Sequence, residues 1–483
     1  DAVAMTGGQP HDGPLNPWQI SQQVHHEGAS KIIVVTDEPD KYPTGTNWAP
    51  GVTIRHRDEL DRVQKELRKT LGCSVLIYDQ TCAAEKRRRR KRGTFPDPDR
   101  RAFINEAVCE GCGDCSVQSN CVSVEPLETS FGRKRQINQS ACNKDFSCIK
   151  GFCPSFVTVS GAVPRRAQAA SAEALDTAAA ALPDPTVASA EGGYNILVTG
   201  IGGTGVITVG ALLGMAAHVE GKGVTVLDFT GIAQKNGAVM SHIRIAPKPE
   251  DLHAVRIAAG GADLLLGADM VAAAAPDSLR KLSRGGTQAI INSHLAPTAD
   301  FTLNPDTEFH GEDLRGLIRN GAGDNRTEFV DATGLATALM GDAIAANLFL
   351  LGHAYQRGAL PVSGDAIDKA IELNGVAVAM NRRAFALGRL AAEDLDQVSK
   401  MAQPAMPAKA EVEETLDDII NHRAAVLTEY QDADYAAQYL AFVRQVETAE
   451  QNKGKGMTGL TEAVARNLFK VMAYKDEYEV ARL

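Results

Sequence analysis

Two short runs of cysteine hold the residues of this sequence that are best suited to chemistry. The first run reads Cys109-Glu-Gly-Cys112-Gly-Asp-Cys115 and is followed by Cys121. A compact loop with two residues between successive cysteines brings the thiolates close together, which suits three corners of a cubane iron–sulfur cluster. Structural zinc sites usually offer pairs of ligands on separate knuckles, so the triplet favours iron and sulfur, with zinc as the alternative.

The second run reads Cys142-Asn-Lys-Asp145-Phe-Ser-Cys148 and continues to Cys153-Pro154. It has the bacterial ferredoxin pattern C-x2-C-x2-C-x3-C-P with two changes. An aspartate stands at the middle position, and the last spacing is one residue longer. The carboxylate of Asp145 can ligate the fourth iron, leave it to solvent, or leave a three-iron cluster.

The order of the cysteines predicts how they divide between two clusters. In two-cluster ferredoxins the fourth cysteine of each run binds the cluster of the other run. The same crossover predicts two 4Fe-4S clusters. The first has the ligands Cys109, Cys112, Cys115 and Cys153, and the second has Cys121, Cys142, Cys148 and Asp145. Of the remaining cysteines, Cys73 opens a predicted strand and is expected in a buried core, whereas Cys82 is a candidate spare ligand.

A glycine-rich loop, Gly200-Ile-Gly202-Gly203-Thr-Gly205, follows a predicted strand and opens a predicted helix. With Asp228 closing the next strand, the pattern is typical of a dinucleotide fingerprint. In that motif the loop turns tightly, a helix N-terminus receives a phosphate and the acid binds the ribose. Close packing of the helix against the strand is the structural alternative for these glycines.

The composition limits the class of protein. A chain of 483 residues allows roughly three domains, and 44% hydrophobic but only 5% aromatic residues predict aliphatic cores. The net charge of −10 argues against a nucleic-acid-binding protein. No uninterrupted apolar stretch reaches the ~18 residues of a membrane-spanning helix. Seven of nine cysteines lie within 109–153, which predicts metal binding in a reducing cytoplasm.

Alternating helices and strands must position these motifs. Residues 1–80 are predicted to end an α/β domain, because two helices and two strands alternate there, which implies a parallel sheet. The two helices are predicted at 18–27 and 58–71, and the two strands at 31–36 and 74–78. Residues 81–160 hold a basic run, 86–92, and the cysteines. Residues 161–193 are rich in Ala, Pro and Ser and are predicted to be a linker.

A second α/β domain is predicted over 194–400, with a helical pattern from about 335 onward. Its predicted strands are 195–199, 223–227, 262–266 and 288–292. Residues 401–483 are predicted to be helical and charged. Because the chain begins without Met at Asp1 and stops within a predicted helix at Leu483, we interpret it as a piece of a longer polypeptide.

Residues 77–157 resemble the bacterial indolepyruvate:ferredoxin oxidoreductases, of the 2-oxoacid:ferredoxin oxidoreductase superfamily. The resemblance is carried by the cysteine runs, by Tyr78-Asp-Gln-Thr-Cys82, by the basic run and by Asn143-Lys-Asp-Phe146, and it extends through essentially all 483 residues. It implies an α/β multidomain chain in a fixed order. That order is the end of a thiamine-binding domain, a ferredoxin-like iron–sulfur module, a Rossmann-like γ-type domain and a helical C-terminal region.

The resemblance also implies a site for Mg²⁺ and thiamine diphosphate, which the segment Val3-Ala-Met-Thr-Gly-Gly-Gln-Pro10 would close. Ala2 would offer its carbonyl to Mg²⁺, and glycines would admit close approach of the diphosphate. The residues lining the diphosphate would be Thr6, Gly7, Gly8 and Gln9. The side-chain Mg²⁺ ligands and the family's Gly-Asp-Gly are absent, and an epitope tag is the alternative reading. Met5, where pyruvate-cleaving relatives commonly have Asn, favours an aromatic substrate.

As activity, the resemblance implies oxidative decarboxylation of a 2-oxoacid, with electrons passing through the clusters to ferredoxin and the acyl group to coenzyme A. The Gly200 loop would then belong to the γ-type domain, which is associated with coenzyme A. The expected partners are ferredoxin, the 2-oxoacid, coenzyme A, the remainder of the polypeptide and further copies in a homo-oligomer. Neither nucleic acid nor membrane is expected, and this chain alone should not catalyse the reaction.

Three interpretations remain for the basic run 86–92: a solvated loop, a surface that steers an acidic ferredoxin, or a surface that packs on a partner subunit. Two alternatives remain for the whole chain. One is an NAD(P)-linked iron–sulfur oxidoreductase that binds dinucleotide at 200–228, and the other is a non-catalytic electron-transfer subunit.

Overall fold

The computed structural model describes most of the chain, which divides into two compact units, Asp1–Asp97 and Pro98–Leu483. The described residues are 15–121, 123–161, 178, 181–201, 205–230, 238–296, 301, 304, 306–308, 310–403 and 415–483.

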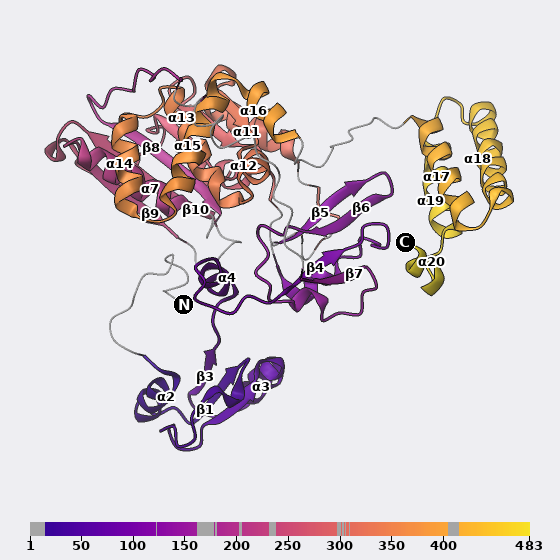
Figure 1. Cartoon of the computed structure of the whole chain (residues 1–483), viewed down its shortest axis with the longest axis horizontal. Coiled ribbons are helices and arrows are strands. Elements are labelled where there is room, and N and C mark those ends of the chain that lie inside the picture. Colours follow the sequence, from indigo (N-terminus) through magenta and orange to yellow (C-terminus); the bar gives the residue numbers. More distant parts are fainter. Residues whose placement is uncertain are drawn as a thin grey trace. The chain divides into compact units, whose positions relative to one another are not determined.

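The first unit is a three-stranded parallel sheet in the order β2-β1-β3 (Figure 1). Residues of β1 point alternately to two cores, one shared with α2 and one with α3, so the central strand is buried on both faces. The predicted parallel alternation is therefore confirmed, and β2 is an additional strand. The elements are α2 (Pro17–His26), β1 (Lys31–Thr36), β2 (Thr53–His56), α3 (Leu60–Arg68), β3 (Ser74–Asp79) and α4 (Ala83–Lys91).

One prediction for this unit is wrong, and one of the three interpretations of the basic run is excluded. Cys73 is exposed and not a buried core thiol, because β3 begins only at Ser74 and Cys73 still lies in the turn that follows Gly72. The basic run is not a loop, since most of it lies on helix α4, where Arg89 pairs with Glu85 one turn away at 3.0 Å.

The segment 98–161 is a small module of two antiparallel strand pairs, β4 with β7 and β5 with β6. Its buried cluster contains Cys109 and Cys115 beside only a few aliphatic residues, and Cys121 and Cys148 pack against it. Thiols therefore take the place of a larger apolar core. The elements are β4 (Arg100–Ile104), α5 (Asp114–Ser119), β5 (Val124–Thr129), β6 (Gly132–Ile137) and β7 (Phe156–Ser160).

The second α/β region is built on a six-stranded mixed sheet in the order β13-β12-β11-β8-β10-β9. Figure 1 labels its strands β8, β9 and β10. Strands β8, β11, β12 and β13 are parallel, whereas β10 is antiparallel to both β8 and β9. The connection 230–237 is shorter than the dozen or so residues that a parallel crossover needs, so β10 must run back beside β9. The strands are β8 (Tyr194–Ile201), β9 (Gly223–Phe229), β10 (Ala238–Ala246), β11 (Leu264–Gly267), β12 (Gln288–Asn292) and β13 (Thr327–Val330).

Helices cover both faces of this sheet and enclose two buried clusters. In the larger cluster the backbones of α13 and α15 are in direct contact. Their close approach is seen at Gly388, where a Cβ would lie 1.8 Å from the Phe349 carbonyl oxygen. Part of the predicted linker also packs here, since Ala188 donates to the Leu360 carbonyl at 2.9 Å. The helices are α7 (Val206–Val219), α8 (Met270–Ala273), α9 (Pro276–Leu279), α11 (Gly311–Ala322), α12 (Ala332–Met340), α13 (Ala346–Gln356), α14 (Gly364–Asn374), α15 (Val378–Glu393) and α16 (Leu395–Ala402).

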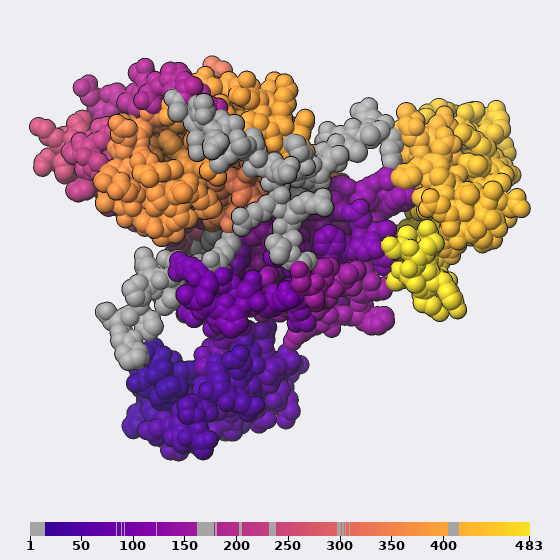
Figure 2. Space-filling model, in the orientation of Figure 1, coloured from indigo at the N-terminus to yellow at the C-terminus, as the bar shows by residue number. Residues whose placement is uncertain are grey.

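The C-terminal region is helical, as predicted, and has its own core. Figure 2 shows the surface of this region at the yellow end of the colour scale. Thr415, Asp432 and Asp476 each accept backbone N–H groups at the start of a helix, which fixes where α17, α18 and α20 begin. The helices are α17 (Leu416–Tyr430), α18 (Ala433–Lys453), α19 (Leu460–Met472) and α20 (Glu477–Arg482). Among the helices that the structure describes, none is long and apolar enough to cross a membrane.

Strand β10 carries a group that makes stability depend on pH. The His242 ring is 1% exposed, and its Nδ1 accepts the Ile257 N–H at 3.2 Å. Burial, together with the charges of Lys281 and Arg256, lowers the pKa of His242 from 6.5 to about 4. The unfolded chain therefore binds this proton more readily, and the stability that the neutral ring provides above pH 6.5 is lost as the pH falls toward 4.

We expect the free energy of unfolding to fall by up to about 3 kcal/mol over this interval because of His242. Denaturant unfolding at a series of pH values should show a shallower fall in His242→Asn than in the wild type. The exposed His253 is the matched control, so His253→Asn should keep the wild-type slope. Equal slopes in wild type and His242→Asn would contradict the prediction.

Candidate functional site

The two cysteine runs begin with the same local backbone. In the first run the Gly111 N–H donates to Cys109 Sγ at 3.4 Å, and in the second the Lys144 N–H donates to Cys142 Sγ at 3.4 Å. Both donors are left-handed, with φ of 72° at Gly111 and 51° at Lys144. An N–H group aimed at sulfur favours the thiolate, which is the form that binds metal.

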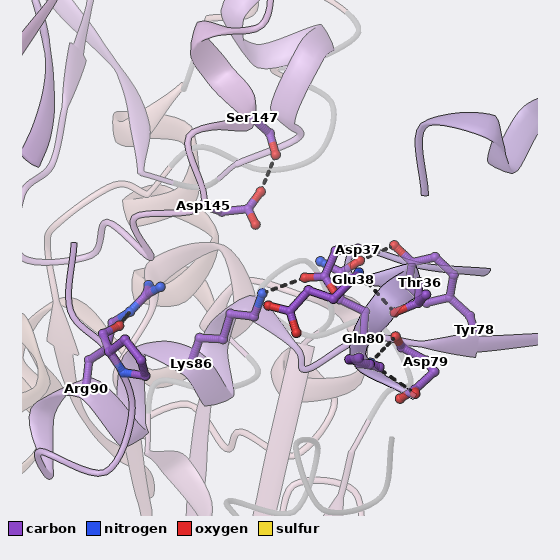
Figure 3. Close-up of polar contacts among 12 residues, drawn as sticks. Thr36, Asp37, Glu38, Tyr78, Asp79, Gln80, Lys86, Arg90, Asp145 and Ser147 are labelled. Atoms are coloured by element: carbon purple, nitrogen blue, oxygen red, sulfur yellow. Dashed lines mark hydrogen bonds and ion pairs between the residues drawn. The ribbon is translucent and has the colours of Figure 1, made fainter. Parts of the chain in front are cut away.

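The correspondence continues two residues later, where Gly113 has φ 82° and Phe146 has φ 60°. The residue between the two left-handed positions is Cys112 in the first run and Asp145 in the second. Asp145 therefore occupies the backbone position of Cys112. Its carboxylate accepts a hydrogen bond from the Ser147 hydroxyl (Figure 3).

The thiols of the first run gather around Cys115. Burial raises the pKa of Cys115 to about 11. The charge of Arg135 acts to lower this pKa, whereas the thiols of Cys109, Cys153 and Cys112 act to raise it. The structure thus brings Cys153, from the end of the second run, beside the first run.

A second neighbourhood forms around Cys148. Burial raises the pKa of Cys148 to about 12, with contributions from Cys121, Cys142 and Cys115. Such pKa values mean that metal binding would have to release protons. Within the described ranges no group of three or more His, Cys, Asp or Glu side chains is arranged to hold a metal ion, so the cluster ligands remain a prediction.

Cations of strand β6 lie beside the first group. Arg135 is 1% exposed, interacts electrostatically with Cys115 and Cys109, and lies over the Phe301 ring at 4.5 Å. The buried Lys134 also interacts with Cys109. The strand is in direct contact with the loop, since a Cβ at Gly111 would lie 2.3 Å from the Arg133 carbonyl oxygen. Sequence reasoning missed these cations, and their only signal is the basic stretch Arg133–Arg135 in a hairpin next to the cysteines.

The glycine-rich loop joins β8 to α7. Gly200 lies at the end of β8, and Gly205 caps α7 with φ 99°, where a Cβ would meet Asn347 Nδ2 at 2.7 Å. Gly202 and Gly203 lie outside the described residues. The close approach of Asn347 explains why position 205 has no side chain.

Asp228 does not lie where a dinucleotide fingerprint needs its acid. In that motif the acid ends the strand next to the first one. Here β10 lies between β8 and β9, and its Ser241 pairs with Val198 on one side and with Asp228 on the other. Asp228 is therefore two strand spacings from β8, about 10 Å. The sheet order thus disfavours dinucleotide binding at this loop.

Two polar residues that no sequence pattern indicated lie at the carboxyl ends of the parallel strands. Asp269, just after β11, is buried, and its Oδ1 accepts the Ala272 N–H at 2.8 Å; burial raises its pKa. Asn292, at the end of β12, donates to the Ala268 carbonyl at 3.0 Å and to Thr333 Oγ1 at 2.8 Å. Strand β11 lies next to β8, where the strand order changes direction, and the carboxyl ends of strands at such a switch point are the usual ligand position in open α/β sheets.

The basic helix α4 is engaged within its own unit. Lys86 Nζ lies 2.9 Å from Asp37 Oδ2 (Figure 3), and Arg90 donates to the Pro96 carbonyl at 2.9 Å. Burial raises the pKa of Asp37, but the hydrogen bond and charge of Lys86 outweigh it and bring the pKa below its usual value. Part of the run is thus structural. The segment predicted to close the thiamine site, with Ala2, Thr6, Gly7, Gly8 and Gln9, lies outside the described residues.

Comparison with known proteins assigns two parts of the chain. Residues 195–391 match the family model described as pyruvate ferredoxin/flavodoxin oxidoreductase. Residues 416–483 match a family of unknown function, DUF6537.

Curated relatives match about two fifths of the chain. Over 204 residues it is 29% identical to the indolepyruvate oxidoreductase subunit IorB of Thermococcus kodakarensis and to that of Pyrococcus horikoshii, covering 42% of this chain and 97% of each relative. The IorB subunit of Methanothermobacter thermautotrophicus is 27% identical over 194 residues, covering 40% of this chain and 94% of the relative.

Among solved structures, the pyruvate oxidoreductase subunit PORC of Thermotoga maritima is 22% identical, with a TM-score of 0.31. The match covers 41% of this chain and 96% of that subunit. The 2-oxoglutarate:ferredoxin oxidoreductase of Magnetococcus marinus is 16% identical, with a TM-score of 0.31, covering 52% of this chain and 41% of its own. From the family match and the curated relatives, residues 195–391 form a γ-type domain similar to that of 2-oxoacid:ferredoxin oxidoreductases.

Proposed function

We propose that the chain is the C-terminal portion of a fused indolepyruvate (arylpyruvate):ferredoxin oxidoreductase. The complete enzyme would oxidatively decarboxylate the 2-oxoacid to acyl-CoA and CO₂ and pass the electrons to ferredoxin. The observation that carries this is the presence, in one chain, of a γ-type domain and a module whose two cysteine runs share one backbone form. The domain limits proposed are 1–80 for the thiamine-binding part, 81–160 for the iron–sulfur module and 194–400 for the γ-type domain, although residues 81–97 belong to the first compact unit of the structure.

Two sets of residues would hold the clusters: Cys109, Cys112, Cys115 and Cys153, and Cys121, Cys142 and Cys148 with Asp145. When bound, the clusters supply one-electron transfer and thiamine diphosphate with Mg²⁺ supplies the carbanion chemistry of decarboxylation. The donor set fits, because soft thiolates suit iron–sulfur clusters and two of them receive backbone N–H groups. Within the first set Cys109 and Cys115 are buried, whereas Cys112 is exposed and Cys153 is partly buried.

At the glycine-rich loop we propose an association with coenzyme A, through Gly200, Gly202, Gly203 and Gly205. The rival NAD(P)-linked enzyme needs an acid on the strand beside β8. Support for coenzyme A over NAD(P) comes from β10, which separates Asp228 from β8.

The substrate preference tests this function in the complete enzyme. The two IorB relatives at 29% identity and Met5 motivate the proposal that the 2-oxoacid is aromatic. We expect kcat/KM, measured by ferredoxin reduction with coenzyme A present, to be at least about tenfold higher for phenylpyruvate and indolepyruvate than for pyruvate or 2-oxoglutarate. A clear preference for pyruvate would sink the arylpyruvate assignment.

A further inference from the structure

The tip of the β5–β6 hairpin is held by the C-terminal helices. Arg423 of α17 is 2% exposed, and its Nη2 donates to the Ser130 carbonyl at 2.6 Å. Its guanidinium lies over the rings of Phe131 and Phe469, at 5.3 Å and 5.8 Å from the centroids. Phe131 is at the hairpin tip and Phe469 is on α19. A buried guanidinium with a carbonyl partner and two aromatic faces is the kind of group that anchors an interface.

The aromatic partners close this contact from both helices. The Phe131 ring lies 5.2 Å from the Phe469 ring and 4.9 Å from the His422 ring. Aromatic pairs at such separations add to the free energy of burial. The hairpin tip is therefore seated between α17 and α19.

A second contact reaches the first cysteine run itself. Lys475, between α19 and α20, pairs with the carboxylate of Glu110 and donates to the Val108 carbonyl at 3.4 Å. Glu110 and Val108 are the two neighbours of Cys109 in the sequence. Asn105, whose carbonyl accepts the Cys109 N–H at 3.0 Å, donates from its side chain to the Leu483 carbonyl at 3.1 Å.

The hairpin and the run are parts of one assembly. The carbonyl of Arg133, on β6, lies so close to Gly111 that a Cβ there would be 2.3 Å away. Val124 of β5 shares the buried cluster with Cys109 and Cys115. The helices thus hold the first run directly through Lys475 and indirectly through the hairpin that supports it.

From these contacts we infer that α17–α20 clamp the iron–sulfur module within the same chain. The helices bind the tip of the β5–β6 hairpin and the Cys109 loop. Their role is to hold the first cysteine group in its ligating geometry. Lys475 also neutralises a carboxylate next to Cys109, which would otherwise repel the negative charge that cysteine ligation brings. For its effect on metal, this inference rests on the proposed function.

The test uses the complete enzyme with Arg423→Met and, separately, Lys475→Met. Samples are exposed to air for increasing times and then reduced again, and the electron paramagnetic resonance signals of the two clusters that remain are measured. We expect the first cluster to be lost at least fivefold faster in each variant, with the second lost at the wild-type rate. The matched control is Arg444→Met, because Arg444 is half-exposed and pairs with Asp417 and Glu447 within the helices, and it should leave both rates unchanged.

A second readout needs no metal. In the metal-free full chain, the rate at which iodoacetamide alkylates Cys109, measured by peptide mass spectrometry, should rise at least fivefold in both variants and stay constant for Cys142. The clamp is overturned if Cys109 is alkylated at the wild-type rate in both Lys475→Met and Arg423→Met. It is also overturned if alkylation of Cys109 and of Cys142 is accelerated equally. A wild-type enzyme that binds no iron would instead overturn the proposed function, while the alkylation rates would still decide on the clamp.

Discussion

Replacing Asp145 with cysteine is expected to abolish the conversion of the second cluster to a three-iron form, which mild oxidation should produce in the wild type. The two runs have left-handed residues at corresponding positions, so the 145 side chain starts from the same backbone position as Cys112 in the first run. Oxygen is a harder and less covalent donor to iron than sulfur, so the iron at Asp145 is held more weakly. Only the cluster on Cys121, Cys142 and Cys148 should therefore have a labile corner.

The reciprocal variant sharpens this experiment. Cys112→Asp should transfer the lability to the first cluster, and a double variant that exchanges the two residues should exchange the behaviour of the clusters. Electron paramagnetic resonance before and after ferricyanide treatment, with iron counted per chain, measures the outcome. If the wild type holds two indistinguishable, oxidation-stable four-iron clusters, then Asp145 is not a ligand. Cys82 or another residue outside the run would then complete the site.

Arg135→Met is expected to make the reduction potential of the first cluster more negative. Reduction adds a negative charge to the cluster, and the buried guanidinium beside Cys115 and Cys109 stabilises that charge. An electrostatic contribution of about 1.4 kcal/mol corresponds to about 59 mV for a one-electron couple, so we expect a shift on the order of 50 mV.

The control for this shift faces the other cluster. The charge of Arg101 counteracts the burial that raises the pKa of Cys142, so Arg101→Met should lower the potential of the second cluster and leave the first unchanged. Potentiometric titrations of the two clusters in both variants measure these shifts. Equal shifts of both clusters in Arg135→Met would mean that the substitution disturbs the module as a whole and that Arg135 does not act on one cluster.

Local patterns predicted six of the strands but not their arrangement. The strands at 31–36 and 288–292 have the predicted limits, and the other four predicted strands differ by a few residues. Strands β2, β4–β7, β10 and β13 were not predicted. Strand β10, although its sequence favours extended structure, lies antiparallel at the point where the sheet changes direction. Its place depends on pairing with β8, far away in the sequence, and no local pattern contains that information.

The candidate site also has a local part that the sequence predicts and a part formed by distant segments that it does not predict. Cysteine spacing names thiols that interact electrostatically in the structure, because a short loop limits the distance between its own side chains, and their role as cluster ligands stays a prediction. It could not indicate Arg135, Arg423 or Lys475, whose relation to the cysteines arises only when separate segments pack. The prediction for Cys73 failed for a local reason, since Cys73 lies one residue before β3, in the turn that follows Gly72, and is exposed there.

The left-handed residues of the two runs differ in chemical type, and if both runs bind clusters as proposed, this difference would set an order for metal insertion during maturation. Gly111 and Gly113 adopt positive φ without steric cost, whereas Lys144 and Phe146 each oppose it by about 1 kcal/mol or more. Before iron arrives, the first loop is therefore closer to its final shape than the second. Assembly of the clusters should begin at the first group, and the ligation energy gained there helps to bring the second loop into its strained form through the shared crossover.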